Sequence, residues 1–287
     1  MIQYTVKPAR SQTPLPEPPF HQYLNDDGSV WTDFYRAGEH YLLRFPGLAD
    51  FDVSADGTEV SAHPMTDCDS NTVEHLYINQ IVPLALSRQG RPAFHASVVT
   101  VPGGAVAFLG QSGAGKSTLA ASFALEDSAF LTDDALLIEE DSGTCMALPS
   151  HASVRLWDDS VDALISDDIL QAGPVSYTPK TRLLAGNALA YSDQPKRLLA
   201  AFVLESSDVD AISIEPLTGT GRYMGWLNNS FLLDVEDQDL LAQHFEWTHR
   251  ISDTIATFTL DYPREYGILP DVRSAVRQHL VELCPQK

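Results

Sequence analysis

The chain has 287 residues, of which 44% are hydrophobic and 20% are charged, and these proportions are typical of soluble globular proteins. Its 39 acidic and 18 basic residues give a net charge of −21, which disfavours binding to nucleic acid or to an anionic membrane. The sequence contains neither an apolar run of about 18 residues nor the apolar core of a signal peptide. We therefore expect a cytoplasmic protein with no membrane span, and we leave self-association to form a homo-oligomer open.

The first ninety residues show short strand patterns and one helical pattern. Local signals predict strands at 40–45 and 49–54 and a turn at Asp56-Gly57. Residues 72–88 place apolar side chains at helical spacing, with Thr72 as the expected N-cap and Pro83 as the expected site of a kink or break. A turn-forming stretch follows. We therefore predict a small N-terminal α+β domain over 1–90, used for substrate binding or interaction, and a catalytic domain over 91–287.

The rest of the chain begins with a compact series of short apolar segments. Strands are predicted at 93–101, 105–110, 129–134, 135–140 and 197–206, and helices at 117–124 and 269–284. Strands that alternate with helices indicate an α/β fold.

A glycine-rich loop separates the second of these strands from the first helix. Residues 110–117, GQSGAGKS, match the pattern G-x-x-x-x-G-K-[ST] at every fixed position. Gly113 and Gly115 allow the backbone N–H groups to point at phosphate oxygens, and the helix N-terminus adds its positive dipole end. Lys116 is expected to contact the β- and γ-phosphates of ATP, and Ser117 is expected to bind Mg²⁺. The predicted nucleotide-binding residues are Gly110, Gln111, Ser112, Gly113, Ala114, Gly115, Lys116, Ser117 and Thr118.

Phosphoryl transfer also needs an acidic group near the metal or the acceptor hydroxyl. Three apolar runs end in such a group, at Asp133-Asp134, at Glu205 and at Asp234. The adjacent pair comes first, 17 residues after Lys116. Its carboxylates would point to opposite faces if the strand stayed regular. If both face the site, one should have a raised pKa, which suits a general base. A solvated turn at the strand end is the alternative interpretation of the pair.

The segment AVAFLGQSGAGKSTLAASF followed by LTDD resembles the catalytic domain of HPr kinase/phosphorylase. It is more similar to the stand-alone relatives of that family, some of which phosphorylate a serine of a lasso-peptide precursor. The resemblance is specific over 93–140 and looser elsewhere. It implies a P-loop kinase fold of the HPr kinase and phosphoenolpyruvate carboxykinase type. It also implies that Asp134 activates the acceptor hydroxyl, that Asp133 lies on the metal side and that His95 takes part in the site. A structural, half-buried histidine is the alternative for His95.

The sequence departs from the family at one motif. The glycine-rich signature that carries a further acidic metal ligand is not visible, and residues 150–164 occupy that region. This difference weakens the case for HPr itself as the substrate and for the reverse phosphorolysis reaction. The cations expected to reach phosphates or substrate in its place are Arg155, Lys180, Arg182 and Arg222, and an ordinary surface cation is the alternative for each.

These observations predict an ATP- and Mg²⁺-dependent kinase. Its acceptor would be an exposed serine of a peptide or small protein, for which a lasso-peptide precursor is one candidate. Two alternatives stay open: a small-molecule kinase of the same fold, and a nucleotide-binding regulatory module with little catalysis.

Overall fold

The computed structural model describes residues 2–25, 27–165, 169–173, 175–205 and 208–283. The chain divides into two compact units. Unit 1 comprises Met1–Arg91, Gly173–Pro179 and Leu232–His244, and unit 2 comprises Pro92–Ala172, Lys180–Phe231 and Phe245–Lys287. The first break lies one residue beyond the predicted domain end. Two later segments of the chain also join unit 1, and no local signal in the sequence indicated that they would.

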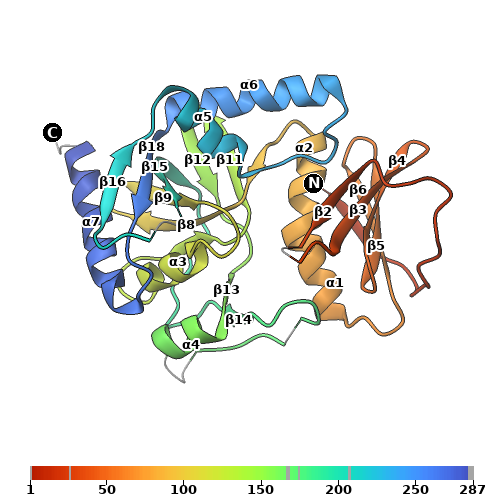
Figure 1. Ribbon diagram of the computed structural model, residues 1–287, viewed down its shortest axis with the longest axis horizontal. Helices are drawn as coiled ribbons and strands as arrows, with labels where there is room; N and C mark the ends of the chain where they lie inside the picture. The colour runs from red at the N-terminus through yellow and green to blue at the C-terminus, as the bar shows by residue number, and fades with distance from the viewer. Residues whose placement is uncertain (1, 26, 166–168, 174, 206–207, 284–287) are drawn as a thin grey trace. The chain divides into compact units, whose positions relative to one another are not determined.

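Unit 1 is built on one sheet (Figure 1). Its strands are β1 (Gln3–Val6), β2 (His21–Leu24), β3 (Val30–Ala37), β4 (His40–Phe45), β5 (Ala49–Ser54) and β6 (Glu59–Pro64). They lie in the order β1-β6-β5-β4-β3-β2, with β1 and β6 parallel and the other neighbours antiparallel. Along β5 the side chains of Phe51 and Val53 are buried, whereas Asp52 and Ser54 are partly exposed. This alternation is the pattern of a strand that buries one face.

A helical segment follows the sheet. It consists of α1 (Ser70–Leu76), a π-helical turn (Tyr77–Ile81) and α2 (Val82–Arg88). The predicted N-cap at Thr72 was wrong, because the carboxylate of Asp69 accepts the N–H of Thr72 at 2.9 Å and so caps the helix earlier. Pro83 lies in the first turn of α2, where its missing N–H costs little. The π-helical turn just before it takes up the change in hydrogen bonding.

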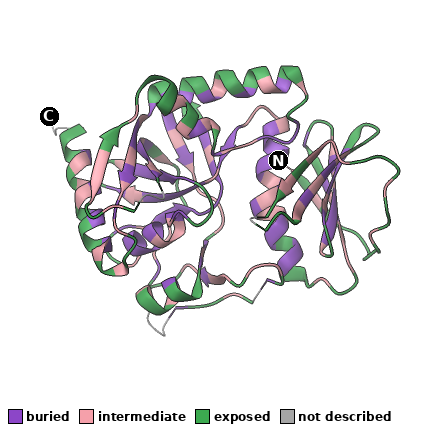
Figure 2. Cartoon of the chain, in the orientation of Figure 1, coloured by how far each residue is buried: buried purple, intermediate pink, exposed green. Residues whose placement is uncertain are grey.

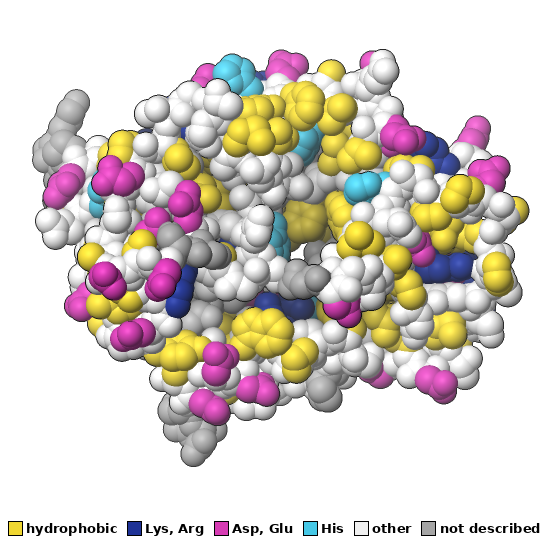
Figure 3. Space-filling view, viewed as in Figure 1, with side chains coloured by type: hydrophobic (Ala, Val, Ile, Leu, Met, Phe, Trp, Pro, Cys, Tyr) yellow, Lys and Arg dark blue, Asp and Glu magenta, His cyan; other side chains and the backbone are white. Residues whose placement is uncertain are grey.

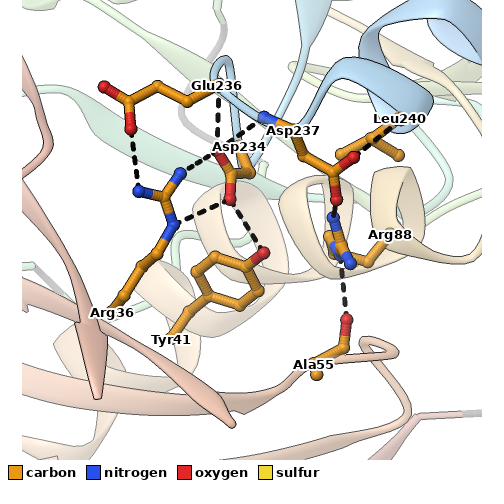
Figure 4. Close-up of polar contacts among 8 residues, drawn as sticks. All are labelled: Arg36, Tyr41, Ala55, Arg88, Asp234, Glu236, Asp237 and Leu240. Carbon is orange, nitrogen blue, oxygen red and sulfur yellow. Dashed lines mark hydrogen bonds and ion pairs between the residues drawn. The ribbon is translucent and has the colours of Figure 1, made fainter. Parts of the chain in front are cut away.

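The segment Leu232–His244 is attached to unit 1 by ion pairs (Figure 4). The guanidinium of Arg36 donates to both carboxylate oxygens of Asp234, at 2.6 and 3.2 Å, and the hydroxyl of Tyr41 donates at 2.9 Å. Arg88 donates to Asp237 at 2.6 Å. Burial would raise the pKa of Asp234, but the hydrogen bonds, led by that of Arg36, hold it below its ordinary value. Asp234 is therefore a structural carboxylate of unit 1.

Unit 2 contains a larger mixed sheet. Its strands are β7 (Ala93–Phe94), β8 (Ala96–Val101), β9 (Gly104–Leu109), β10 (Phe130–Thr132), β11 (Leu136–Asp141), β12 (Thr144–Leu148), β15 (Lys196–Leu204), β16 (Ser213–Pro216), β17 (Ser230–Phe231) and β18 (Ala256–Asp261). The order is β10-β8-β9-β15-β12-β11-β7-β17, and β18 pairs with β15 and β16. The strands β9, β15 and β18 run parallel, so their carboxyl ends lie at one edge. A separate antiparallel pair joins β13 (Ser153–Leu156) to β14 (Thr181–Leu184).

Both faces of this sheet are covered. Its helices are α3 (Lys116–Ala124), α4 (Asp158–Leu164), α5 (Gly219–Leu227), α7 (Leu269–Leu283) and the later part of α6 (Gln238–Thr254), and a 3-10 turn (Tyr266–Ile268) precedes α7. Phe108 of β9 packs in the cluster that contains residues of α3 and α7, whereas Leu109 packs with Trp226 of α5 and Ile251 of α6. The strand is therefore buried on both sides (Figure 2) and reads as a continuous apolar run.

Several predicted boundaries shift for local reasons. The strand predicted over 93–101 is interrupted at His95, whose backbone N–H donates to the carbonyl of Asn229, the residue before β17. The strand predicted over 129–134 ends at Thr132, before the acidic pair. The ends predicted at Ser206 and Cys284 lie outside the described residues.

The surface reflects the acidic composition. Asp and Glu side chains are spread over the face shown in Figure 3, and Lys and Arg side chains are sparser there. Within the described part of the chain, every helix is too short or too polar to cross a membrane.

Candidate nucleotide-binding site

The glycine loop joins β9 to α3 in unit 2, as its sequence predicted. Gly113 and Gly115 have φ angles of 83° and 88°, a left-handed conformation that other residues adopt only with strain. A Cβ at Gly113 would meet no protein atom within 4 Å, so the protein contacts there do not require glycine but the backbone angle does. The tip of the loop, at Gln111 and Ser112, is exposed. The backbone thus turns sharply at two glycines before the helix begins.

Lys116 lies inside this turn. The residue is 5% exposed, and its Nζ donates to the carbonyl oxygens of Gly110 at 2.6 Å and Gln111 at 2.9 Å. Burial lowers the pKa of Lys116 to about 8, and the negative charges of Asp134 and Asp133 oppose this only in part. The cation is therefore poorly solvated and lies close enough to both acids to interact with their charges.

The first helical residues after Lys116 differ in their contacts. Ser117 is half-buried at the second position of α3. The hydroxyl of Thr118 hydrogen-bonds that of Ser160 at 3.1 Å, and Ser160 in turn hydrogen-bonds the hydroxyl of Tyr266 at 3.1 Å. Two successive hydrogen bonds between hydroxyl groups thus link Thr118 to α4 and to the turn before α7.

The acidic pair does not continue a regular strand. Asp134 has a φ of 71°, so the two carboxylates are not forced to opposite faces. Arg155 contacts both of them: its backbone N–H donates to Asp133 Oδ2 at 3.1 Å, and its guanidinium donates to Asp134 Oδ2, from Nε at 3.0 Å and also from Nη2. Ser97 donates to the other oxygen of Asp133 at 2.6 Å.

The two acids have opposite pKa shifts. Burial and the neighbouring charge of Asp134 raise the pKa of Asp133. Burial would also raise the pKa of Asp134, but the charge and hydrogen bonds of Arg155, together with the nearby His95 and Lys180, hold it well below its ordinary value. Asp134 is therefore the ionised member of the pair, and Asp133 is the member with the higher proton affinity.

His95 lies beside the pair. Its Nδ1 is 3.0 Å from the backbone carbonyl oxygen of Asp134, and because that oxygen can only accept, Nδ1 carries the proton. Burial and the charge of Lys116 lower the pKa of His95 to about 4. The imidazole is therefore neutral near pH 7, with the lone pair on Nε2.

The cations selected from the sequence separate into two groups. Lys180 Nζ lies 5.0 Å from the centre of the Trp157 ring. Burial lowers the pKa of Lys180, and the negative charge of Asp134 opposes this shift. It thus belongs to the charged centre around Asp134, as Arg155 does. Arg182 donates to Ser153 at 3.0 Å, on the β13–β14 pair. Arg222 forms an ion pair with Asp253, which is the surface role given as its alternative.

Several neighbours of the loop were not predicted. The side-chain oxygen of Asn229 accepts the N–H of Gly110 at 3.0 Å, which ties the start of the loop to the residue that receives the His95 N–H. His151 has a pKa lowered to about 4 by burial, with the charge of Asp134 opposing the shift. Glu205, one of the sequence candidates, is exposed and contributes a carbonyl oxygen rather than a carboxylate contact.

The donor types present fit a magnesium ion. Mg²⁺ keeps several water ligands and takes one or two protein oxygens, which the Ser117 hydroxyl and an acidic side chain can supply. Among the described residues, no group of three or more His, Cys, Asp or Glu side chains is arranged to hold a metal by itself.

No protein family model matches the chain, and no curated protein matches it significantly. Among solved structures, the Hpr(Ser) kinase/phosphatase from Coxiella burnetii is similar over 56% of this chain and 97% of that chain. Its sequence identity is 12% and the TM-score is 0.28. The likeness concerns the fold alone, and a TM-score this low carries no argument about activity. The proposals below therefore rest on the residues of this chain.

Proposed function

We propose that the protein is a kinase that transfers the γ-phosphate of Mg·ATP to a serine hydroxyl of a peptide or small protein. The observation that carries this proposal is the combination of a glycine loop around a buried lysine with an ionised carboxylate, that of Asp134, close enough to interact with the same lysine. Phosphoryl transfer needs both parts, one to hold the phosphates and one to position the acceptor.

The loop supplies the phosphate-binding groups. The N–H groups of Lys116, Ser117 and Thr118 precede the first hydrogen bond within α3, from the Leu119 N–H to the Gly115 carbonyl at 2.9 Å. They are therefore available to phosphate oxygens, in the field of the helix N-terminus. Lys116 would exchange its two carbonyl partners for β- and γ-phosphate oxygens. This exchange is favourable because an anionic partner compensates the desolvation that lowers the pKa of Lys116.

Ser117 and Asp133 are the residues we assign to Mg²⁺. When bound, the ion would neutralise charge on the phosphates and orient them. Because its pKa is raised, Asp133 holds a proton to higher pH than an ordinary carboxylate, so metal binding should weaken as the pH falls.

Asp134 is assigned to the acceptor. The guanidinium hydrogen bonds that Asp134 accepts from Arg155 both go to Oδ2, so we assign Oδ1 to the serine hydroxyl. The serine oxygen would form a bond to the γ-phosphorus as the bond from that phosphorus to the β,γ-bridging oxygen breaks, and ADP would leave. The hydroxyl proton would pass to the carboxylate. A carboxylate with a lowered pKa is a weak base, which suits a transition state in which little proton transfer has occurred. The neutral imidazole of His95 is the second candidate for the proton.

The proposal is tested by mass spectrometry of acceptors incubated with the protein and Mg·ATP. The three sets are serine-containing peptides encoded near its gene, a phosphocarrier protein, and a panel of small alcohols and sugars. Gain of one phosphoryl group on a peptide serine is the expected result, and the Lys116→Ala protein should show none. Transfer only to small molecules would replace the peptide acceptor with a small one. ATP hydrolysis without transfer would support the regulatory module instead.

A further inference from the structure

The loop that follows β18 borders the phosphate-binding loop. Because β9, β15 and β18 are parallel, the segments after their carboxyl ends meet at one edge of the sheet, the place where ligands bind in such sheets. A Cβ at Gly110, after β9, would lie 2.9 Å from the Leu204 carbonyl at the end of β15. The end of β18 at Asp261 is followed directly by a tyrosine and, two residues later, an arginine.

These two side chains lie against Gly115. A Cβ at Gly115 would be 3.3 Å from the hydroxyl of Tyr262 and 3.5 Å from Nη1 of Arg264. The guanidinium of Arg264 stacks on the Tyr262 ring, 4.3 Å from its centre, and donates to the carbonyl of Glu205. The arginine is exposed, yet it is held at the glycine that precedes Lys116. A guanidinium carries five N–H donors, and among the described residues Arg264 hydrogen-bonds the Glu205 carbonyl and the Tyr262 hydroxyl, fewer partners than it has donors.

The two sides of the phosphate loop differ in chemistry. On one side Lys116 interacts with the charges of Asp133 and Asp134, where transfer of the γ-phosphate is proposed. On the other side Gly115 meets Arg264, and the hydroxyl chain from Thr118 leads to the turn at Tyr266. The second side contains a cation and hydroxyl groups, and the atoms that a Cβ at Gly115 would meet belong to Tyr262 and Arg264. The carboxylate of Asp159 hydrogen-bonds the Tyr266 hydroxyl, at the end of the hydroxyl chain away from Thr118.

We propose that Arg264, held on Tyr262, binds the α- and β-phosphates of the nucleotide. This inference rests on the proposed nucleotide site and adds a recognition residue to it. The ligand class is a nucleoside di- or triphosphate, since both carry the phosphates in question. Arg264 acts on binding and not on transfer of the γ-phosphate, because the acids lie on the other side of the loop.

The test compares Arg264→Gln with Arg250→Gln. Arg250 is a matched control, because it is also exposed and its guanidinium lies 4.4 Å from the centre of an aromatic ring, that of Trp247. Dissociation constants for Mg·ATP and Mg·ADP are measured by calorimetry, and kcat is measured at saturating Mg·ATP. Arg264→Gln should bind both nucleotides roughly tenfold more weakly, the usual effect of removing a charged hydrogen bond. Its kcat should stay within about twofold of the wild type, since the acids are intact.

Each of the other possible outcomes contradicts a specific part of the proposal. Unchanged affinity in Arg264→Gln, with affinity lost in Lys116→Ala, would refute the role of Arg264 and leave the nucleotide site standing. Weaker binding of Mg·ATP with normal binding of Mg·ADP would place Arg264 at the γ-phosphate, against the proposal. Unchanged affinity in Lys116→Ala would refute the proposed function itself. If Arg264→Gln melts at a lower temperature without nucleotide, Arg264→Lys serves instead, and it should weaken binding of both nucleotides by a smaller factor.

Discussion

The buried cation of the phosphate loop should destabilise the protein that contains no nucleotide. The perturbation that shows this is Lys116→Met, which keeps the length of the side chain and removes its charge. A pKa lowered from 10.5 to about 8 corresponds to roughly 3 kcal/mol of unfavourable free energy for the charged lysine at pH 7. The variant also loses hydrogen bonds to the carbonyls of Gly110 and Gln111, worth about 1 kcal/mol each. The net expectation is a variant about 1 kcal/mol more stable than the wild type.

Bound Mg·ATP should make the wild type more stable than Lys116→Met. Mg·ATP at about 100 times its dissociation constant stabilises the wild type by roughly 2.7 kcal/mol and should leave the variant unchanged. The assay is urea unfolding at pH 7, followed by circular dichroism and tryptophan fluorescence, with and without Mg·ATP. The variant should be the more stable protein without nucleotide, and the wild type should be the more stable one with it.

The pH dependence gives an independent check. The folded pKa of Lys116, about 8, lies below the unfolded value of 10.5, so the unfolded state binds more protons between these values. The penalty is therefore fully present below about pH 8 and disappears as the pH rises toward 10.5. The advantage of Lys116→Met should shrink between pH 7 and pH 9.5. A variant about 2 kcal/mol less stable than the wild type at pH 7, or a difference independent of pH, would refute the reasoning.

Three further changes test other parts of the molecule. Asp134→Asn should still bind Mg·ATP in calorimetry and should lose on the order of 10² in turnover, and near-normal turnover would move the proton acceptor to His95. Gly115→Ala should bind Mg·ATP more weakly than Gly113→Ala. Both positions have a positive φ, but only a Cβ at Gly115 would meet Tyr262 and Arg264. Equal affinity of the two variants would contradict this. Asp234→Ala should lower the free energy of unfolding at pH 7 by about 3 kcal/mol, because Arg36 would lose its buried partner. The pKa of Asp234 in the folded protein is lowered, so the difference in unfolding free energy from the wild type should shrink as the pH falls below about 4. A difference that does not change with pH would count against the Arg36 ion pair.

The local sequence predicts the phosphate loop well because the loop is a local structure. The conformations of Gly113 and Gly115 follow from the spacing of the motif. The apolar runs on either side predict β9 and α3 to within one residue. The acidic pair could also be located from the sequence, since it ends the next apolar run after the helix. Its ionisation could not, because it depends on Arg155, a residue from a strand that pairs elsewhere.

Long-range placement accounts for the residues that were missed. Arg264 reaches Gly115 only because β9 and β18 both flank β15 in the sheet, and no spacing rule in the chain reports that order. Asp234 follows an apolar run just as the acidic pair does, yet Arg36, far away in the sequence, holds it in unit 1. The helix α6 carried a usable signal that was overlooked: Asp237 accepts the N–H of Leu240 at 3.0 Å and so caps its first turn (Figure 4).

Arg155 acts differently on the two neighbouring acids of the site. Its backbone N–H is a neutral donor to Asp133, whereas its guanidinium brings a full positive charge to Asp134. Both carboxylates are buried, so burial alone would raise both pKa values. The charge of Arg155 opposes burial at both acids, but it outweighs burial only at Asp134, which the guanidinium contacts directly. The charge of Asp134 also raises the pKa of Asp133, which concentrates the negative charge on Asp134. Arg155 thus keeps the proposed acceptor carboxylate ionised, whereas burial and the charge of Asp134 give Asp133 the higher proton affinity of the two.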